Sequence, residues 1–128
     1  MQYGGKIMKY ETLYNDFIDL FPSKKAKLEE YAKKASADPS DGMHIMFGMV
    51  IIPFLLDLLN DNDQSSLKVA FSFFEQMEES NDQMILEVLE FTVLENIVSK
   101  GKNISTKLTS YMGRKTLDSF YTIEKYLL

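Results

Sequence analysis

A chain of 128 residues is long enough to form one domain with its own hydrophobic core. With 45% hydrophobic and 26% charged residues it has a globular composition, and its net charge of −5 disfavours nucleic acid as a partner. The absence of cysteine excludes disulfides, thiolate catalysis and the usual zinc sites. We therefore predict one cytoplasmic domain over residues 1–128, in which residues 1–8 are disordered or peripheral.

The hydrophobic periodicity predicts an all-α fold. Apolar residues recur at helical spacing, and no run of alternating apolar and polar residues is long enough for a sheet. Pro22 and Gly101 are suitable helix terminators. We expect a compact bundle of about six to seven helices. Their predicted ranges are 9–20, 24–35, 43–59, 66–79, 82–100, 104–112 and 114–127.

The segment 43–59 is the most apolar of these helices. It falls short of the roughly 20 apolar residues that a membrane-spanning helix needs, and it contains Pro53 and Asp57. A helix that is apolar on every side is typically the one around which the others pack. We therefore predict a buried central helix and no membrane association. Pro53 either kinks this helix or begins a second one after a short first one.

The middle of the chain has the rhythm of a helical hairpin. Residues 51–63, continuing to 67–70, resemble one HEAT repeat, in which an apolar helix, an acidic turn and a second apolar helix follow one another. We predict a HEAT-like pair at the centre of the bundle and no long solenoid. After the second helix, Ser80 and Gln83 have the spacing of a capping box.

We find no pattern that indicates catalysis, a cofactor or a metal. The chain lacks a P-loop and a serine in an elbow motif, and its single histidine cannot supply a di-iron bundle. His44 is interpreted as a structural side chain bonded to a loop carbonyl or carboxylate, with a pH-sensitive partner contact as the alternative. Asn96 falls on the apolar face of its helix, and we expect it to tie that helix to a loop or helix end.

Charge is distributed unevenly along the chain. Residues 41–99 contain eleven acids and one base, Lys68, whereas residues 1–40 have a net charge of +1 and residues 100–128 of +4. Two interpretations remain open: the carboxylates keep the protein soluble and are neutralised internally, or they form a surface for a basic protein. Under the second interpretation the candidate partner-binding residues are Asp57, Asp61, Asp63, Glu75, Glu78, Glu79, Asp82, Glu87, Glu90 and Glu95. Of these, we expect Glu78, Glu79, Asp82, Glu87 and Glu90 to be solvated.

Several short motifs resemble a family of small all-helical bacterial proteins of unknown function. They are Phe21-Pro22, Asp41-Gly42, His44, Phe47-Gly48, Leu55-Leu56 and the run from Phe91 to Asn96. Some members resemble immunity proteins of contact-dependent and other polymorphic toxin systems. The resemblance covers roughly residues 17–113 and departs at Arg114, where a proline or helix cap is expected. It implies an inhibitor-like binding role and no catalytic residue.

Together these observations predict a bacterial immunity protein. It would bind a cognate toxin, for example a nuclease, and occlude a basic cleft with its acidic helical face. The alternative function is a helical adaptor that binds a peptide or helix in an apolar groove. A small-ligand bundle is disfavoured, because few polar groups converge inside an apolar pocket.

Overall fold

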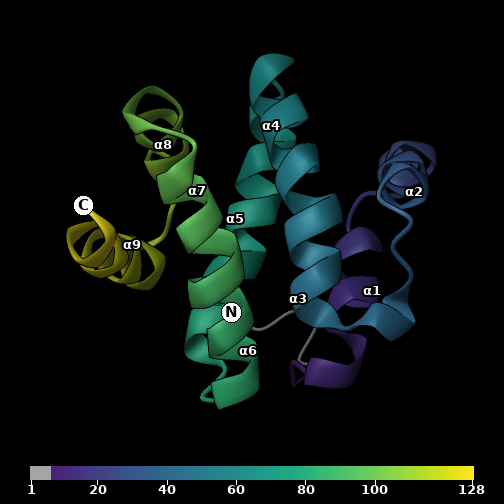
Figure 1. Cartoon of the computed structure of the whole chain (residues 1–128), viewed down its shortest axis with the longest axis horizontal. Helices are drawn as coiled ribbons and strands as arrows, with labels where there is room; N and C mark the ends of the chain where they lie inside the picture. The colour runs from purple at the N-terminus through teal and green to yellow at the C-terminus, as the bar shows by residue number, and fades with distance from the viewer. Residues whose placement is uncertain (1–6) are drawn as a thin grey trace.

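The computed structural model describes residues 7–128, and all of the regular structure in that range is helical (Figure 1). The sequence predicts that residues 1–8 are disordered or peripheral. Residues 1–6 of that range lie outside the described residues. Ile7 is exposed, and Met8 packs at the margin of the core. The α-helices are α1 (Leu13–Ile18), α2 (Lys25–Lys34), α3 (Met43–Met46), α4 (Ile52–Asn60), α5 (Gln64–Glu79), α6 (Gln83–Glu87), α7 (Glu95–Ser99), α8 (Lys102–Thr109) and α9 (Arg114–Leu127).

Two long helices of this bundle each contain a π-helical turn. The π-turn Phe47–Ile51 joins α3 to α4, and the π-turn Val88–Leu94 joins α6 to α7. We call the continuous helix Met43–Asn60 the first rod, and the continuous helix of residues 83–99 the second rod. When each rod is counted once, residues 7–128 form seven helices, in agreement with the predicted number.

The two rods lie side by side and run in the same direction, with α5 packed behind them (Figure 1). Helix α2 covers the outer side of the first rod, and α9 covers the outer side of the second. The predicted hairpin is present as α4 and α5, which pack against each other across the turn at residues 61–63. This arrangement leaves one long side of each rod facing solvent.

The core lies between the rods, α5 and the two flanking helices. Rings from distant parts of the chain meet there: Phe17 of α1 packs edge-on against Phe73 of α5 at 5.3 Å between ring centroids. The first rod is long and apolar enough to cross a membrane by length and composition alone. It contributes Met46, Phe47 and Val50, among others, to the buried core. The rod is thus packed as the predicted central helix.

Pro53 neither breaks nor simply kinks the first rod. Proline lacks the amide hydrogen that would bond to the carbonyl one turn earlier, so a regular α-helix that contains proline loses one backbone hydrogen bond. The wider π-turn directly before Pro53 lets the rod continue into α4. The second rod has no proline, and nothing in its sequence periodicity predicts its π-turn.

The predicted capping box at Ser80 and Gln83 is wrong. Asp82 is the N-cap of α6, and its Oδ1 accepts hydrogen bonds from Met84 N at 3.0 Å and Ile85 N at 3.4 Å. Ser80 instead closes the end of α5, because its hydroxyl donates to the carbonyl of Met77. Asp82 directly precedes Gln83, the first residue of α6, so it caps the amides of Met84 and Ile85 and not the Gln83 amide that a Ser80 cap would have used.

Candidate functional site

The predicted acidic residues nearest α2 are neutralised within the protein. Asp57 Oδ2 lies 3.7 Å from Lys27 Nζ, and Asp63 Oδ2 lies 3.1 Å from Lys24 Nζ. Asp63 is also the N-cap of α5, where its Oδ1 accepts a hydrogen bond from Ser66 N at 3.2 Å. That backbone hydrogen bond is the main cause that lowers the pKa of Asp63, and the Ser66 side chain and then Lys24 lower it further against the opposing effect of burial. These two ion pairs connect the α4–α5 hairpin to α2 and to Lys24, the residue directly before α2.

Glu75 is used inside the fold at the opposite flank. Its Oε2 accepts a hydrogen bond from Lys115 N at 3.0 Å, and its Oε1 accepts from Thr116 N at 2.9 Å and Thr116 Oγ1 at 2.8 Å. Burial raises the pKa of Glu75, but the hydrogen bonds from Thr116 and Lys115 outweigh that effect and leave the pKa below its usual value. A carboxylate at a helix N-terminus also interacts favourably with the helix dipole. Glu75 is therefore the N-terminal cap of α9, supplied from α5.

Glu78 is not solvated as predicted. It lies one turn after Glu75 on α5, and its Oε2 is buried without a hydrogen-bond partner among the described residues. Burial raises the pKa of Glu78 to about 7, with further increases from the negative charges of Glu90 and Glu75. The Ser119 hydroxyl of α9 donates to Glu90 Oε2 at 3.4 Å. Glu78 and Glu90 thus belong to the contact between α5, the second rod and α9.

The remaining predicted carboxylates are more accessible. Asp61 and Glu79 are exposed, whereas Asp82 is occupied as the N-cap of α6. Glu87 accepts a hydrogen bond from Gln83, and it and Glu95 have no lysine or arginine within ion-pair distance in residues 7–128. The ten predicted residues do not share one face. Asp57 and Asp63 bind lysines near α2, Asp63, Glu75 and Asp82 cap helices, and Glu78 and Glu90 lie in the contact with α9. Asp61, Glu79, Glu87 and Glu95 have none of these roles within residues 7–128.

Polar side chains meet where the two rods touch. His44 Nδ1 lies 2.5 Å from Thr92 Oγ1, with which it shares a hydrogen bond. Gly48 faces Thr92 and Asn96 of the second rod, where a Cβ would lie 3.4 Å from Thr92 Cγ2 and 4.0 Å from Asn96 Nδ2, in ordinary van der Waals contact. We call His44, Gly48, Thr92 and Asn96 the seam. It joins the two π-turns, a type of turn that recurs at functional sites.

The seam corrects two sequence predictions. His44 bonds to a threonine hydroxyl of the neighbouring rod and not to a loop carbonyl or carboxylate. Asn96 is only partly buried, and its Nδ2 donates to the carbonyl of Thr92 at 2.8 Å, one turn earlier in its own rod. In a π-turn the backbone amide of residue i+4 does not bond the carbonyl of residue i. Asn96 therefore supports the widened turn of its own helix and does not tie it to a loop.

The seam determines which side chains share the solvent face of the rods. Successive residues are about 100° apart around a helix. The two rods are parallel, and their seam residues face each other. The side chains that directly follow His44 and Gly48 in the first rod therefore point to the same side as those that directly precede Thr92 and Asn96 in the second rod. The residues on the opposite side, such as Phe47 and Val93, are buried. The solvent side, which we call the seam face, carries Ile45, Met49, Met84, Glu87, Phe91 and Glu95.

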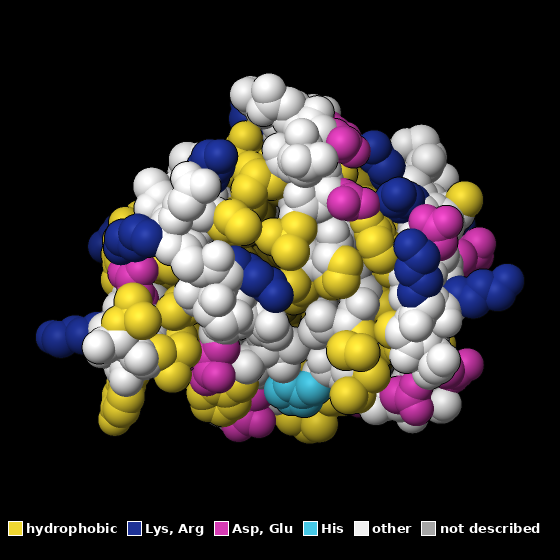
Figure 2. All heavy atoms as spheres, turned by 45° about the horizontal axis from the view of Figure 1, so that its top comes forward, with side chains coloured by type: hydrophobic (Ala, Val, Ile, Leu, Met, Phe, Trp, Pro, Cys, Tyr) yellow, Lys and Arg dark blue, Asp and Glu magenta, His cyan; other side chains and the backbone are white. Residues whose placement is uncertain are grey.

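Large apolar side chains are exposed on the seam face. The exposed fractions are 45% for Ile45, 48% for Met49, 54% for Met84 and 56% for Phe91. Figure 2 shows hydrophobic side chains on both sides of the single histidine near the lower edge of this view. Neither rod contains lysine or arginine, and of their four carboxylates Glu87 and Glu95 lie on the seam face with the apolar residues.

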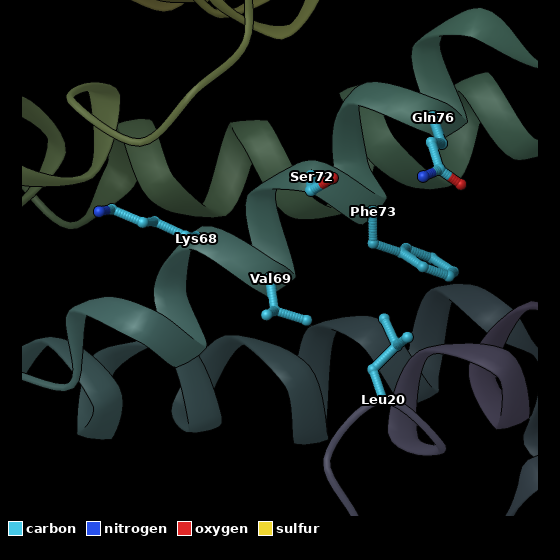
Figure 3. A pocket seen from close by; sticks show the side chains of 6 residues that line it. All are labelled: Leu20, Lys68, Val69, Ser72, Phe73 and Gln76. Carbon is cyan, nitrogen blue, oxygen red and sulfur yellow. The ribbon is translucent and has the colours of Figure 1, made fainter. Parts of the chain in front are cut away.

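Two shallow hollows lie away from the seam face. One, on the outer side of α5, has a volume of about 260 Å³; Leu20, Val69 and Phe73 converge in it while Lys68 points away (Figure 3). The other, of about 420 Å³, lies between the end of α4 and α8, beside Leu59 and Lys107. Neither is lined by a histidine or carboxylate. Within residues 7–128 no three histidine or acidic side chains are grouped to hold a metal ion.

A family model described as a domain of unknown function, DUF7674, matches residues 14–127. The chain belongs to the DUF7674 family. The DUF7674 domain therefore includes both rods, the seam and α9, and extends beyond the Arg114 position where the predicted resemblance departs. Neither the comparison with curated proteins nor the comparison with solved structures gives a match.

Sequence reasoning missed the exposed apolar residues of the DUF7674 domain. At 100° per residue Phe91 falls well away from the apolar face that Ile85 and Leu89 form, so helical spacing alone was a signal for its exposure. A signal was available for the role of Glu75. Gly113 and Arg114 offer no capping side chain at the start of α9, so a cap from another element was required.

Proposed function

We propose that this DUF7674 domain is a cytoplasmic protein-binding module that acts as a bacterial immunity protein and neutralises a toxin by covering its basic cleft. The observation that carries the proposal is the unpaired acidity of the second rod. Glu87 and Glu95 lie on its solvent side without a cationic partner in the described part of the chain, and Glu79 precedes it on an exposed turn of α5. Unpaired carboxylates on one side of a protein attract a basic partner and speed its association.

The internal contacts limit the number of carboxylates that can belong to the proposed interface. Asp57, Asp63 and Glu75 are occupied by lysines or helix amides, so a partner would have to break those contacts to use them. Glu79, Glu87 and Glu95 are free to meet a partner without such a cost. The proposal concerns binding and assigns no catalytic residue.

The test is a protection assay with the toxin domain encoded beside this gene. Co-expression of the protein should restore growth, and the purified pair should bind more weakly as salt rises, mainly through slower association. Lysine substitutions at Glu79, Glu87 and Glu95 should each reduce affinity and flatten the salt dependence. Glu29→Lys and Glu30→Lys on α2 are the matched controls and should leave binding intact.

Protection that survives all three reversals, with affinity unchanged at low salt, would refute the acidic interface. A specific observation favours the second candidate, a helical adaptor: the exposed Ile45, Met49, Met84 and Phe91 offer apolar contact area. An adaptor would bind its target with little salt dependence, and no neighbouring gene would encode a toxin domain.

A further inference from the structure

The seam face combines two kinds of surface that usually mark different partners. Ile45 and Met49 of the first rod and Phe91 of the second are roughly half exposed, although they occupy neighbouring positions on one face. Apolar residues scattered singly on a surface need no explanation, but a contiguous group marks a contact site. Glu87 and Glu95 lie on the same face of the second rod as Phe91, at helical spacing from it.

We propose that the seam face binds a cationic amphipathic segment of the partner protein. Apolar side chains of that segment would cover Ile45, Met49 and Phe91, while its lysines or arginines would meet Glu87 and Glu95. This inference rests on the proposed toxin-binding function and specifies the part of the partner that is held. The proposed occupant of the seam face is a basic segment of a protein.

Charge complementarity decides against other occupants. The two rods carry four carboxylates and no lysine or arginine, so nucleic acid and anionic lipid are repelled. A second copy of this chain bound through the same face would bring its own Glu87 and Glu95 close to those of the first copy, and the like charges would repel. A segment with lysine or arginine beside apolar residues satisfies both parts of the face at once.

The seam fixes the width of this face. The hydrogen bond between His44 and Thr92 joins the rods next to the exposed residues, and Gly48 faces Thr92 and Asn96 in the same contact. Ile45 follows His44, Met49 follows Gly48, and Phe91 precedes Thr92, so each exposed side chain is adjacent in sequence to a seam residue. The apolar contacts are thus held on rigid helices before a partner arrives, which lowers the entropic cost of binding.

The inference is tested first with a synthetic probe. The probe is a helical peptide of about five turns with leucine on one face and lysine and arginine on the other. Fluorescence anisotropy should show binding, and a version with glutamate in place of the basic residues should not bind. A scrambled peptide of the same composition should bind at least about 10-fold more weakly, because its apolar residues no longer share one face.

Matched variants locate the site. Phe91→Ser and Met49→Ser should each weaken probe binding about 10-fold or more, and Glu87→Lys combined with Glu95→Lys should weaken it and reduce its salt dependence. Tyr126→Ser is the control, since Tyr126 is an exposed aromatic residue at the end of α9. Circular dichroism melts verify that each variant stays folded, and the two serine variants give independent readings if one of them does not.

The same variants in the toxin protection assay separate the two proposals. Loss of protection in Phe91→Ser but not in Tyr126→Ser supports both. Protection that persists in every seam-face variant overturns this inference and leaves the proposed function standing. Probe binding at the seam face without protection against the neighbouring toxin overturns the proposed function alone. Binding to anionic vesicles in place of the probe, or a dimer that Phe91→Ser dissociates, would also overturn the inference.

Discussion

Helix α5 and the second rod both carry acidic side chains, yet these side chains have different roles. Glu75 and Glu78 of α5 lie against α9, where one accepts three hydrogen bonds and the other is partly buried. Glu87 and Glu95 of the second rod lie on the solvent side without cationic partners in residues 7–128. Acidity along a sequence therefore does not identify an interface. The position of each carboxylate relative to helix ends and neighbouring helices decides its role.

The largest effect is expected at Glu75. Glu75→Gln should lower the free energy of unfolding by about 2–3 kcal/mol, because the amide removes the charge and one acceptor at the start of α9. Urea denaturation measures this loss. Glu79→Gln, one turn away on the exposed side of the same helix, should change stability by less than about 0.5 kcal/mol. Equal effects of the two substitutions would contradict the assignment of Glu75 as the cap.

Gly113 provides an independent way to disturb the same contact. A Cβ at this position would lie 2.5 Å from Cδ of Glu75, whose carboxylate is held by three hydrogen bonds. Gly113→Ala should therefore displace the cap. In a double-mutant cycle, Gly113→Ala should cost much less in a Glu75→Ala background, which lacks the Cγ and Cδ atoms that the new Cβ would meet, than in the original protein. Additive losses would show that Gly113 acts through something other than Glu75.

Glu78 should make stability depend on pH. Its pKa is about 7 in the folded protein and 4.5 for an ordinary glutamate, so folding favours its protonated form. The stabilisation is fully present below pH 4.5 and is lost as the pH rises through 7. Since the carboxyl is only about half buried, solvent screening reduces the loss to about 1–2 kcal/mol. Glu78→Gln stays neutral and should be more stable than the original protein at pH 8, and a flat pH profile of the original protein would contradict this.

Asn96 tests the seam rather than the acidic residues. Asn96→Leu keeps the size of the side chain but removes its hydrogen bond to the Thr92 carbonyl, and we expect a loss of about 1 kcal/mol. Thermal unfolding should show a lower Tm than Gln83→Leu, which changes an exposed amide on the same rod. An unchanged melt would mean that water replaces the Asn96 amide without cost.

The smallest effect on stability is expected on the second rod. Glu87→Lys and Glu95→Lys should each change the free energy of unfolding by less than about 0.5 kcal/mol, since neither carboxylate is paired with a cation. Urea denaturation of both variants beside Glu75→Gln checks this. A loss comparable to that of Glu75→Gln would show that the acidic side chains of α5 and the second rod do not differ in role.

The helical architecture could be predicted because its signals are local. Apolar spacing, Pro22 and Gly101 located the helices, and Gly101 indeed has a φ of +98° that favours glycine. The caps were harder to assign. Asp82 competes with Ser80 for the same helix start, and Glu75 lies 40 residues from Lys115, beyond any local pattern.

The candidate site could be predicted only in part. The sequence placed Glu87 on the solvated side of its helix, but it treated Glu75 and Glu78 as equivalent to it. Their contacts depend on where α9 docks, which no local pattern specifies. Helical periodicity places Phe91 well away from the apolar face of its helix, but no local pattern shows that it shares a solvent face with Ile45 and Met49 of the first rod.

Each π-turn also has a consequence for insertions and deletions. A π-turn is equivalent to an α-helix into which one extra residue has been inserted. Deleting one residue from 88–94 would therefore allow α6 and α7 to join as a regular α-helix without rotating the residues beyond the deletion. Asn96 would stay in the seam, whereas a deletion in the regular helix of α7 would rotate the residues beyond it by about 100°. A relative shorter by one residue in 88–94 would therefore present the same seam to its partner, although its second rod lacked the π-turn.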